Sequence, residues 1–307
     1  MSNSTLSTNG TDCVVDGNSD IYGLGIRIGF YLQWYGSVIA SMPRRRHGQL
    51  AGDEVQGLIY ANIIFSVATF IALASQTSNL QLSEIYIVLL LIFGYQYFAI
   101  PVIVFDLVET VMQIFRGGNG ASAAGRGWVY NLLFSILLFA ISCFQLWFWA
   151  SHFQSGGQKP SCPDFGFALN RVELDNKGFR AFNLTWFSLL LIASLLFTYQ
   201  SWQMFSTRRK ATGSVRDTLS TKPSRSSLDN SRSNSLLQYI RSAALILFVT
   251  IVVIAVEASI TWNHISGVGS LDSAGQLIPF FVGLGAILRV FYVGFRDWHF
   301  THDMGYE

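Results

Sequence analysis

The stretch LILFVTIVVIAVEASITW, residues 245–262, decides the fold class of this chain. Its only ionisable side chain is Glu257, and about 20 predominantly apolar residues are enough to cross the hydrocarbon core of a bilayer. Because no water satisfies the backbone at that depth, a spanning segment of this kind must be a helix. The stretch therefore predicts a transmembrane helix with one acidic group inside it.

Six other segments share this length and apolar character, which predicts an all-α integral membrane bundle of seven transmembrane helices. The predicted spans are 21–42, 55–75, 82–105, 128–150, 181–205, 238–262 and 275–295. Apolar residues make up 51% of the 307 residues and charged residues only 12%, about half the charge of an ordinary soluble domain. A membrane β-barrel is disfavoured, because it would need short segments of alternating hydrophobicity. Gly25 and Gly29 in the first span predict a surface for close helix packing.

Basic residues are unequally distributed between the loops on the two sides of this bundle. One side holds 14 lysines and arginines, whereas the other holds four, all between residues 159 and 180. By the positive-inside rule, the N-terminus is lumenal or outside and the C-terminus is cytosolic. The predicted organisation is a polar lumenal tail (1–20), helices one to five (21–205) with a lumenal loop (151–180), a disordered basic cytosolic loop (206–237), helices six and seven (238–295) and a cytosolic tail (296–307).

The two lumenal segments carry the predicted modifications. Asn3 and Asn9 lie in Asn-x-Ser/Thr acceptors for glycosylation in the lumenal tail. Cys13 and Cys162 would both lie in an oxidising compartment, where they would either form a disulfide or remain free thiols. The tail lacks the apolar core of a cleaved signal peptide, so we expect a multi-pass protein of the endoplasmic reticulum or another endomembrane.

Charged side chains inside the spans are the main functional candidates, since each is costly in a membrane unless it is paired or hydrated. Thr250, Glu257, Thr261 and His264 fall on one stripe at helical spacing, which indicates an inward face. One interpretation of Glu257 is a structural ion pair with Arg27 at similar depth. The other is a chemical role, and the first does not exclude the second.

The segment FDLVET, residues 105–110, places Asp106 and Glu109 on one face of a helix. Burial and like-charge repulsion both raise a carboxyl pKa, so one of the two acids could remain protonated and act as a proton donor. The alternative is that this segment marks the cytosolic interface, with Arg289 or Arg116 as the counter-ion.

Several function classes are disfavoured by motifs that the sequence lacks. Five histidines without metal-ligand spacing argue against a di-iron hydroxylase, and no Gly-rich phosphate loop or Rossmann turn occurs. The seventh span has no lysine for a retinal Schiff base. We therefore expect no metal, no cofactor and no nucleic-acid partner, and the oligomeric state stays open.

Two stretches, DIYGLGIRIGFYLQWYG at 20–36 and VEASITWNHISGVGSLDSAGQLIP at 256–279, resemble a large set of fungal multi-pass membrane proteins. In size and layout the chain is also similar to the fungal integral-membrane terpene cyclases of meroterpenoid biosynthesis, of the ascofuranone/ascochlorin type. This resemblance implies a metal-free reaction in which a prenylated aromatic, with a terminal epoxide or olefin, is protonated and closes a ring through a carbocation.

The hypothesis that follows is a membrane-bound terpene cyclase acting on a lipophilic small molecule within the bilayer. Its candidate catalytic acids are Glu257, Asp106 and Glu109. Its candidate substrate-binding residues are Arg27, Trp34, Tyr95, Trp262, Asn263 and His264. The alternative is a seven-helix transporter or sensor that uses the same charges without covalent chemistry.

Overall fold

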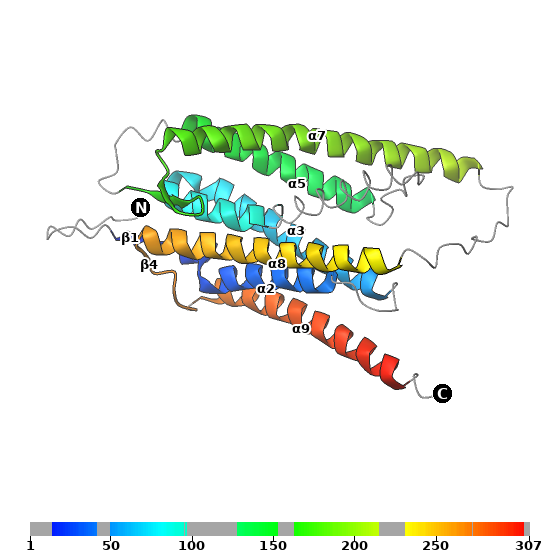
Figure 1. Cartoon of the computed structure of the whole chain (residues 1–307). Coiled ribbons are helices and arrows are strands. Elements are labelled where there is room, and N and C mark those ends of the chain that lie inside the picture. The colour runs from blue at the N-terminus through cyan, green and yellow to red at the C-terminus, as the bar shows by residue number, and fades with distance from the viewer. Residues whose placement is uncertain are drawn as a thin grey trace, which may run out of the picture.

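The computed structural model describes residues 14–41, 50–94, 96, 128–152, 163–214, 231–271 and 273–303, and these residues are mostly helical (Figure 1). The α-helices are α1 (Ser19–Tyr22), α2 (Leu24–Ser41), α3 (Leu50–Gln76), α5 (Trp128–Trp147), α7 (Lys177–Ser214), α8 (Ser231–Trp262) and α9 (Ala274–Asp303), and an apolar helix at Leu82–Gly94 follows α3. Two short turns of other helix types are η1 (Thr77–Asn79) and η2 (Phe148–His152). Four short strands are β1 (Val15–Asp16), β2 (Phe165–Phe167), β3 (Arg171–Glu173) and β4 (Ile265–Ser266).

Five of these helical segments are long and apolar enough to cross a membrane, which indicates a membrane protein. They are Tyr60–Asn79, Leu132–Ser151, Lys177–Gln203, Tyr239–Trp262 and Ala274–Arg296. The helical membrane class predicted from the sequence is thus confirmed, whereas the count of seven spans and the orientation stay predictions.

Two of the seven predicted spans are not among these five. Segment 21–42 forms α2, whose hydropathy is lowered by Arg27 and Gln33. Segment 82–105 begins as the Leu82–Gly94 helix, and nearly all of its remaining residues lie outside the described ones. The ends of the predicted 206–237 loop are helical, since α7 continues to Ser214 and α8 begins at Ser231; residues 215–230 lie outside the described part.

The helices pack as two groups that are visible in Figure 1. Helix α2 lies along α9 and also contacts α3 and α8, whereas α5 lies along α7. Aromatic and aliphatic side chains fill the space between the helices, and Phe30 of α2 packs on Phe65 of α3 with ring centroids 4.3 Å apart. Helix α2 therefore packs against three other long helices, α3, α8 and α9.

Glycine allows the close approach of α2 and α9. A Cβ atom on Gly29 would lie 2.5 Å from the Pro279 carbonyl oxygen, and one on Gly283 would lie 2.6 Å from the Gly29 oxygen. A Cβ on Gly25 would collide with the backbone of Gln276. The two helices therefore touch backbone to backbone, which confirms the packing surface predicted from Gly25 and Gly29.

The strands gather at one end of the bundle, which we call the strand end (the left of Figure 1). Strand β1 pairs in parallel with β4, and β2 pairs with β3 as an antiparallel hairpin. Glu84 binds the N-terminal segment at this end. Its carboxylate accepts hydrogen bonds from the Tyr22 hydroxyl (2.8 Å) and the Asn18 N–H (3.0 Å). Its second oxygen accepts from the Gln81 N–H (2.8 Å), which caps the following helix.

Candidate functional site

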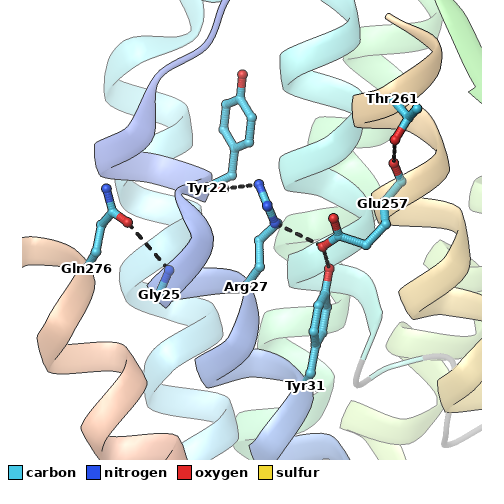
Figure 2. Close-up of polar contacts among 7 residues, drawn as sticks. All are labelled: Tyr22, Gly25, Arg27, Tyr31, Glu257, Thr261 and Gln276. Carbon is cyan, nitrogen blue, oxygen red and sulfur yellow. Dashed lines mark hydrogen bonds and ion pairs between the residues drawn. The ribbon is translucent and has the colours of Figure 1, made fainter. Parts of the chain in front are cut away.

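Two of the charged side chains predicted inside the membrane, Arg27 and Glu257, meet between α2 and α8 (Figure 2). Arg27 Nε lies 3.0 Å from Glu257 Oε1, and the Tyr31 hydroxyl donates to that same oxygen over 2.7 Å. The Arg27 guanidinium also donates to the Tyr22 carbonyl oxygen (3.1 Å). The side chain of Arg27 is 4% exposed and that of Glu257 is 44% exposed. An ion pair between Arg27 and Glu257, which the sequence suggested, is therefore present.

Helical spacing explains why these three residues meet. Arg27 and Tyr31 are four residues apart, so both lie on the face of α2 that is directed at α8. The Arg27 guanidinium and the Tyr31 hydroxyl are both directed at the same carboxylate oxygen of Glu257. These contacts join α2 to α8 and give Glu257 a structural role between the two helices.

The other described candidates do not converge on Glu257. Trp34 is buried, with its ring against Gly94 and 5.6 Å from the ring of Tyr31. Trp262 stacks on Phe167 at 5.9 Å. These aromatic contacts are packing contacts within the fold.

Asn263 and His264 lie at the strand end, beyond the last turn of α8. The Asn263 side chain accepts from the Phe165 N–H and donates to the Phe165 carbonyl, both over 2.8 Å. His264 has a left-handed backbone (φ 49°), and its carbonyl accepts from the Val15 N–H. Both residues thus hold strands in place.

Several predicted residues lie outside the described part of the chain. These are the candidate acids Asp106 and Glu109, the candidate ligand residue Tyr95, the acceptors Asn3 and Asn9, and the cysteines Cys13 and Cys162. Their roles stay predictions.

Sequence reasoning did not find the cavity that the structure shows. It has a volume of about 600 Å³ and lies between α5, α7, α8, the Leu82–Gly94 helix and the β2–β3 hairpin. Aromatic and aliphatic side chains dominate its walls, among them Trp149, Phe179, Phe187 and Val252, and Gln145 and Asn183 are among its polar groups. None of the described lining residues carries a charged side chain. Such a cavity is within the size range and character of small-molecule sites.

The β2–β3 hairpin closes the cavity at the strand end. Phe167, Ala168 and Val172 of the hairpin belong to its lining. The Tyr86 hydroxyl donates to the Phe167 carbonyl (3.1 Å) and accepts from the Phe167 N–H (3.2 Å), and the Asn263 bonds hold the other end of β2. The β2–β3 hairpin, which we call the roof of the cavity, is therefore hydrogen-bonded to the Leu82–Gly94 helix and to the residue that follows α8.

The side of the cavity between α7 and α8 is less closed. These two helices both line the cavity, yet they are not among the helix pairs that pack closely on one another (Figure 1). The lining residues Phe182 of α7 and Phe248 of α8 are 63% and 37% exposed. Both lie within helical segments that are long and apolar enough to cross a membrane.

A weak signal for the cavity was present in the sequence. Phe179, Asn183 and Phe187 are spaced by four residues and form one stripe of α7. The same spacing occurs on packed helices without cavities, so the stripe alone could not identify a site.

Asp164, just before β2, should make the stability of the strand end depend on pH. Burial raises the pKa of this carboxyl above its ordinary value of 3.8, and the charge of Glu84 adds to the increase, while Ser83 opposes it. Since the folded state then binds the proton more tightly than the unfolded state, the free energy of unfolding should rise as pH falls from neutral towards about 4.

Melting of the purified protein at pH values between 4 and 8 measures this dependence. Asp164→Asn should flatten the profile, whereas Asp175→Asn, which removes an exposed acid nearby, should leave it unchanged. An equal slope in Asp164→Asn and the parent protein would contradict the assignment.

In the described residues, no group of three or more His, Cys, Asp or Glu side chains is placed to hold a metal ion. No protein-family model, curated protein or solved structure matches the chain. The function must therefore be argued from the cavity and the ion pair themselves.

Proposed function

We propose that the protein binds a lipophilic small molecule inside its helix bundle and acts as a membrane sensor or transporter without covalent chemistry. The cavity of about 600 Å³ is the observation that carries this proposal. Its walls are mostly apolar and aromatic with a few polar groups, and its open side lies between two helical segments that are able to cross a membrane. These are the properties of a site for a molecule that arrives dissolved in the bilayer.

The ion pair supports binding rather than proton chemistry at Glu257. The Glu257 carboxylate is held by Arg27 and Tyr31, and Glu257 is not among the residues that line the cavity. The pair instead links α2 to α8, one of the helices that form the cavity wall. Glu257 thus acts on the shape of the site rather than on the ligand.

Filling the cavity tests this proposal. Ala255 is buried on α8 and lines the cavity, so Ala255→Trp should place a large ring inside it. We expect labelling of cavity peptides by a photoreactive long-chain alkane to fall at least about tenfold, because overfilled sites exclude ligands. The probe is applied to the full chain in lipid nanodiscs, and the labelled peptides are identified by mass spectrometry.

The matched control is Ala243→Trp, which changes an exposed position of the same helix. Labelling that is equal in the parent protein and Ala255→Trp would show that the cavity does not take the probe, and the proposal would then fail.

The second candidate is the acid-initiated terpene cyclase suggested by the resemblance. The aromatic rings of Trp149, Phe179 and Phe187 on the cavity wall favour it, because ring faces stabilise a passing carbocation. Of its candidate proton donors we favour Asp106 and Glu109, because Glu257 is held in an ion pair with Arg27.

Microsomes supplied with a prenylated aromatic epoxide test the cyclase. A new cyclic product should form and should be lost in Asp106→Asn or Glu109→Gln, whereas Glu257→Gln should retain product in proportion to folded protein. Full turnover by all three amides would exclude acid catalysis by these residues.

The number of spans, the orientation of the termini and the cellular location are part of the same proposal. Seven spans, a lumenal N-terminus and an endomembrane location are supported by the unequal distribution of basic residues between the loops. In that orientation the hairpin roof lies on the lumenal side.

A further inference from the structure

The chemistry of the cavity wall narrows the class of ligand, an inference that rests on the proposed binding function. No described lining residue is charged, and the nearby arginines of the hairpin and α7 are engaged elsewhere. Arg171 lies 3.5 Å above the Phe165 ring, and Arg180 donates to the carbonyl oxygens of Trp149 (2.7 Å) and Ala150 (3.1 Å). An ionised carboxylate or ammonium would lose its hydration here without a counter-ion, which is strongly unfavourable.

Two buried carboxamides, one from α5 and one from α7, line the same cavity. The helices are antiparallel, and the bond from Arg180 to Trp149 fixes their register. Gln145 and Asn183 each lie about one helical turn beyond this bond, on α5 and α7 respectively. Both residues are buried and line the cavity.

These carboxamides retain hydrogen-bonding capacity. Gln145 Oε1 accepts from the Trp149 indole N–H (3.0 Å), and Asn183 Nδ2 donates to the Phe179 carbonyl (2.8 Å). Within the described residues, these bonds leave the Gln145 amino group and the Asn183 side-chain carbonyl without a partner. One donor and one acceptor are therefore available on the α5–α7 side of a largely apolar space.

The opposite wall offers no such groups. Helix α8 contributes Phe248, Ile251, Val252 and Ala255, all apolar. A ligand lying between the two walls meets hydrogen-bonding groups on its α5–α7 side and hydrocarbon on its α8 side.

We propose that the cavity selects an uncharged, lipid-soluble molecule with a single hydroxyl or carbonyl group, and that Gln145 and Asn183 bind this group. A hydroxyl satisfies both carboxamides at once, since it donates to the Asn183 carbonyl and accepts from the Gln145 amino group. A carbonyl satisfies the Gln145 amino group alone. A plain hydrocarbon would leave both buried groups unsatisfied.

Three photoreactive probes with the same sixteen-carbon diazirine chain test the proposal. One ends in a hydroxyl group, one in a carboxylate and one in a methyl group, and each is added to the full chain in nanodiscs. We expect the alcohol to label cavity peptides about five- to tenfold more than the hydrocarbon, as one or two hydrogen bonds predict. The carboxylate should label least.

The variant Gln145→Met with Asn183→Leu should reduce alcohol labelling to the hydrocarbon level and leave hydrocarbon labelling intact. Retained hydrocarbon labelling also shows that the variant folds with its cavity. Ser188→Ala, on an exposed face of α7, is the control and should keep the preference for the alcohol.

The possible failures are distinguishable. If no probe labels the cavity saturably, the proposed binding function fails. If the hydrocarbon or the carboxylate labels as strongly as the alcohol, or if the double variant keeps the preference, the cavity remains a site but the assigned ligand class is wrong.

Discussion

Replacing Glu257 by leucine should destabilise the protein by about 3–5 kcal/mol, because it leaves a charged guanidinium buried without a partner. The side chain of Arg27 is 4% exposed, and its ion-pair partner is Glu257. Among the described residues, only the Tyr22 carbonyl oxygen would still accept a hydrogen bond from it. Unfolding in mixed detergent micelles, followed by tryptophan fluorescence, measures the loss.

The paired substitution Arg27→Met with Glu257→Leu separates a structural role from a chemical one. Removing both charges should recover most of the lost stability, since apolar residues of similar volume replace buried ion pairs at little cost. If the recovered protein also labels with the cavity probe as the parent does, the pair serves the fold alone. Glu173→Gln, which removes an exposed acid on β3, is the control and should change stability by less than about 0.5 kcal/mol.

A double variant that remains as unstable as Glu257→Leu would show that more than the ion pair holds α2 against α8. The Tyr31 bond to Glu257 would then be the contact to remove next, by Tyr31→Phe.

Adding one methyl group at Gly29 should have an effect of similar size. Gly29→Ala places a Cβ atom 2.5 Å from the Pro279 carbonyl oxygen, and backbone cannot give way as a flexible side chain can. The α2 and α9 helices must separate, at an expected cost of about 3 kcal/mol. Gly283→Ala should behave alike, because its Cβ would lie 2.6 Å from the Gly29 oxygen.

Two other glycines on the same helices provide controls, because alanine at these positions should not lower the stability. A Cβ on Gly36 meets the Ile287 Cα at an ordinary 3.8 Å, and one on Gly285 meets no described atom within 4 Å. Alanine at these positions should leave stability unchanged or raise it by up to about 1 kcal/mol, because alanine favours a helix over glycine. Equal effects at Gly29 and Gly36 would contradict the backbone contact between α2 and α9.

The sequence predicted those parts of the structure that depend on local composition, or on the pairing of opposite charges at similar depth in the predicted membrane spans. Apolar runs indicated the helices, and the cost of a lone charge in a membrane suggested an ion pair between Arg27 and Glu257. Gly25 and Gly29 marked a packing surface, although only the structure identified α9 as its partner.

The parts that the sequence did not predict depend on contacts between distant residues. The hairpin arises from a polar loop whose strands are three residues each, and its position over the cavity depends on Tyr86, 81 residues away from Phe167. No local pattern encodes such a pairing. The sequence suggested Asn263 as a candidate substrate-binding residue, yet its side chain bonds to the backbone of β2.

The central place of α2 has a consequence for biosynthesis. Arg27 leaves the ribosome early, whereas Glu257 follows Tyr31 by 226 residues. At translation rates of roughly 5–20 residues per second, the guanidinium waits about 10 to 45 s for its carboxylate. During that interval the nascent α2 carries an unneutralised cation, and neither α8 nor α9 exists to receive it. Among the described long helices, the first to be synthesised therefore completes its contacts with α8 and α9 only near the end of synthesis.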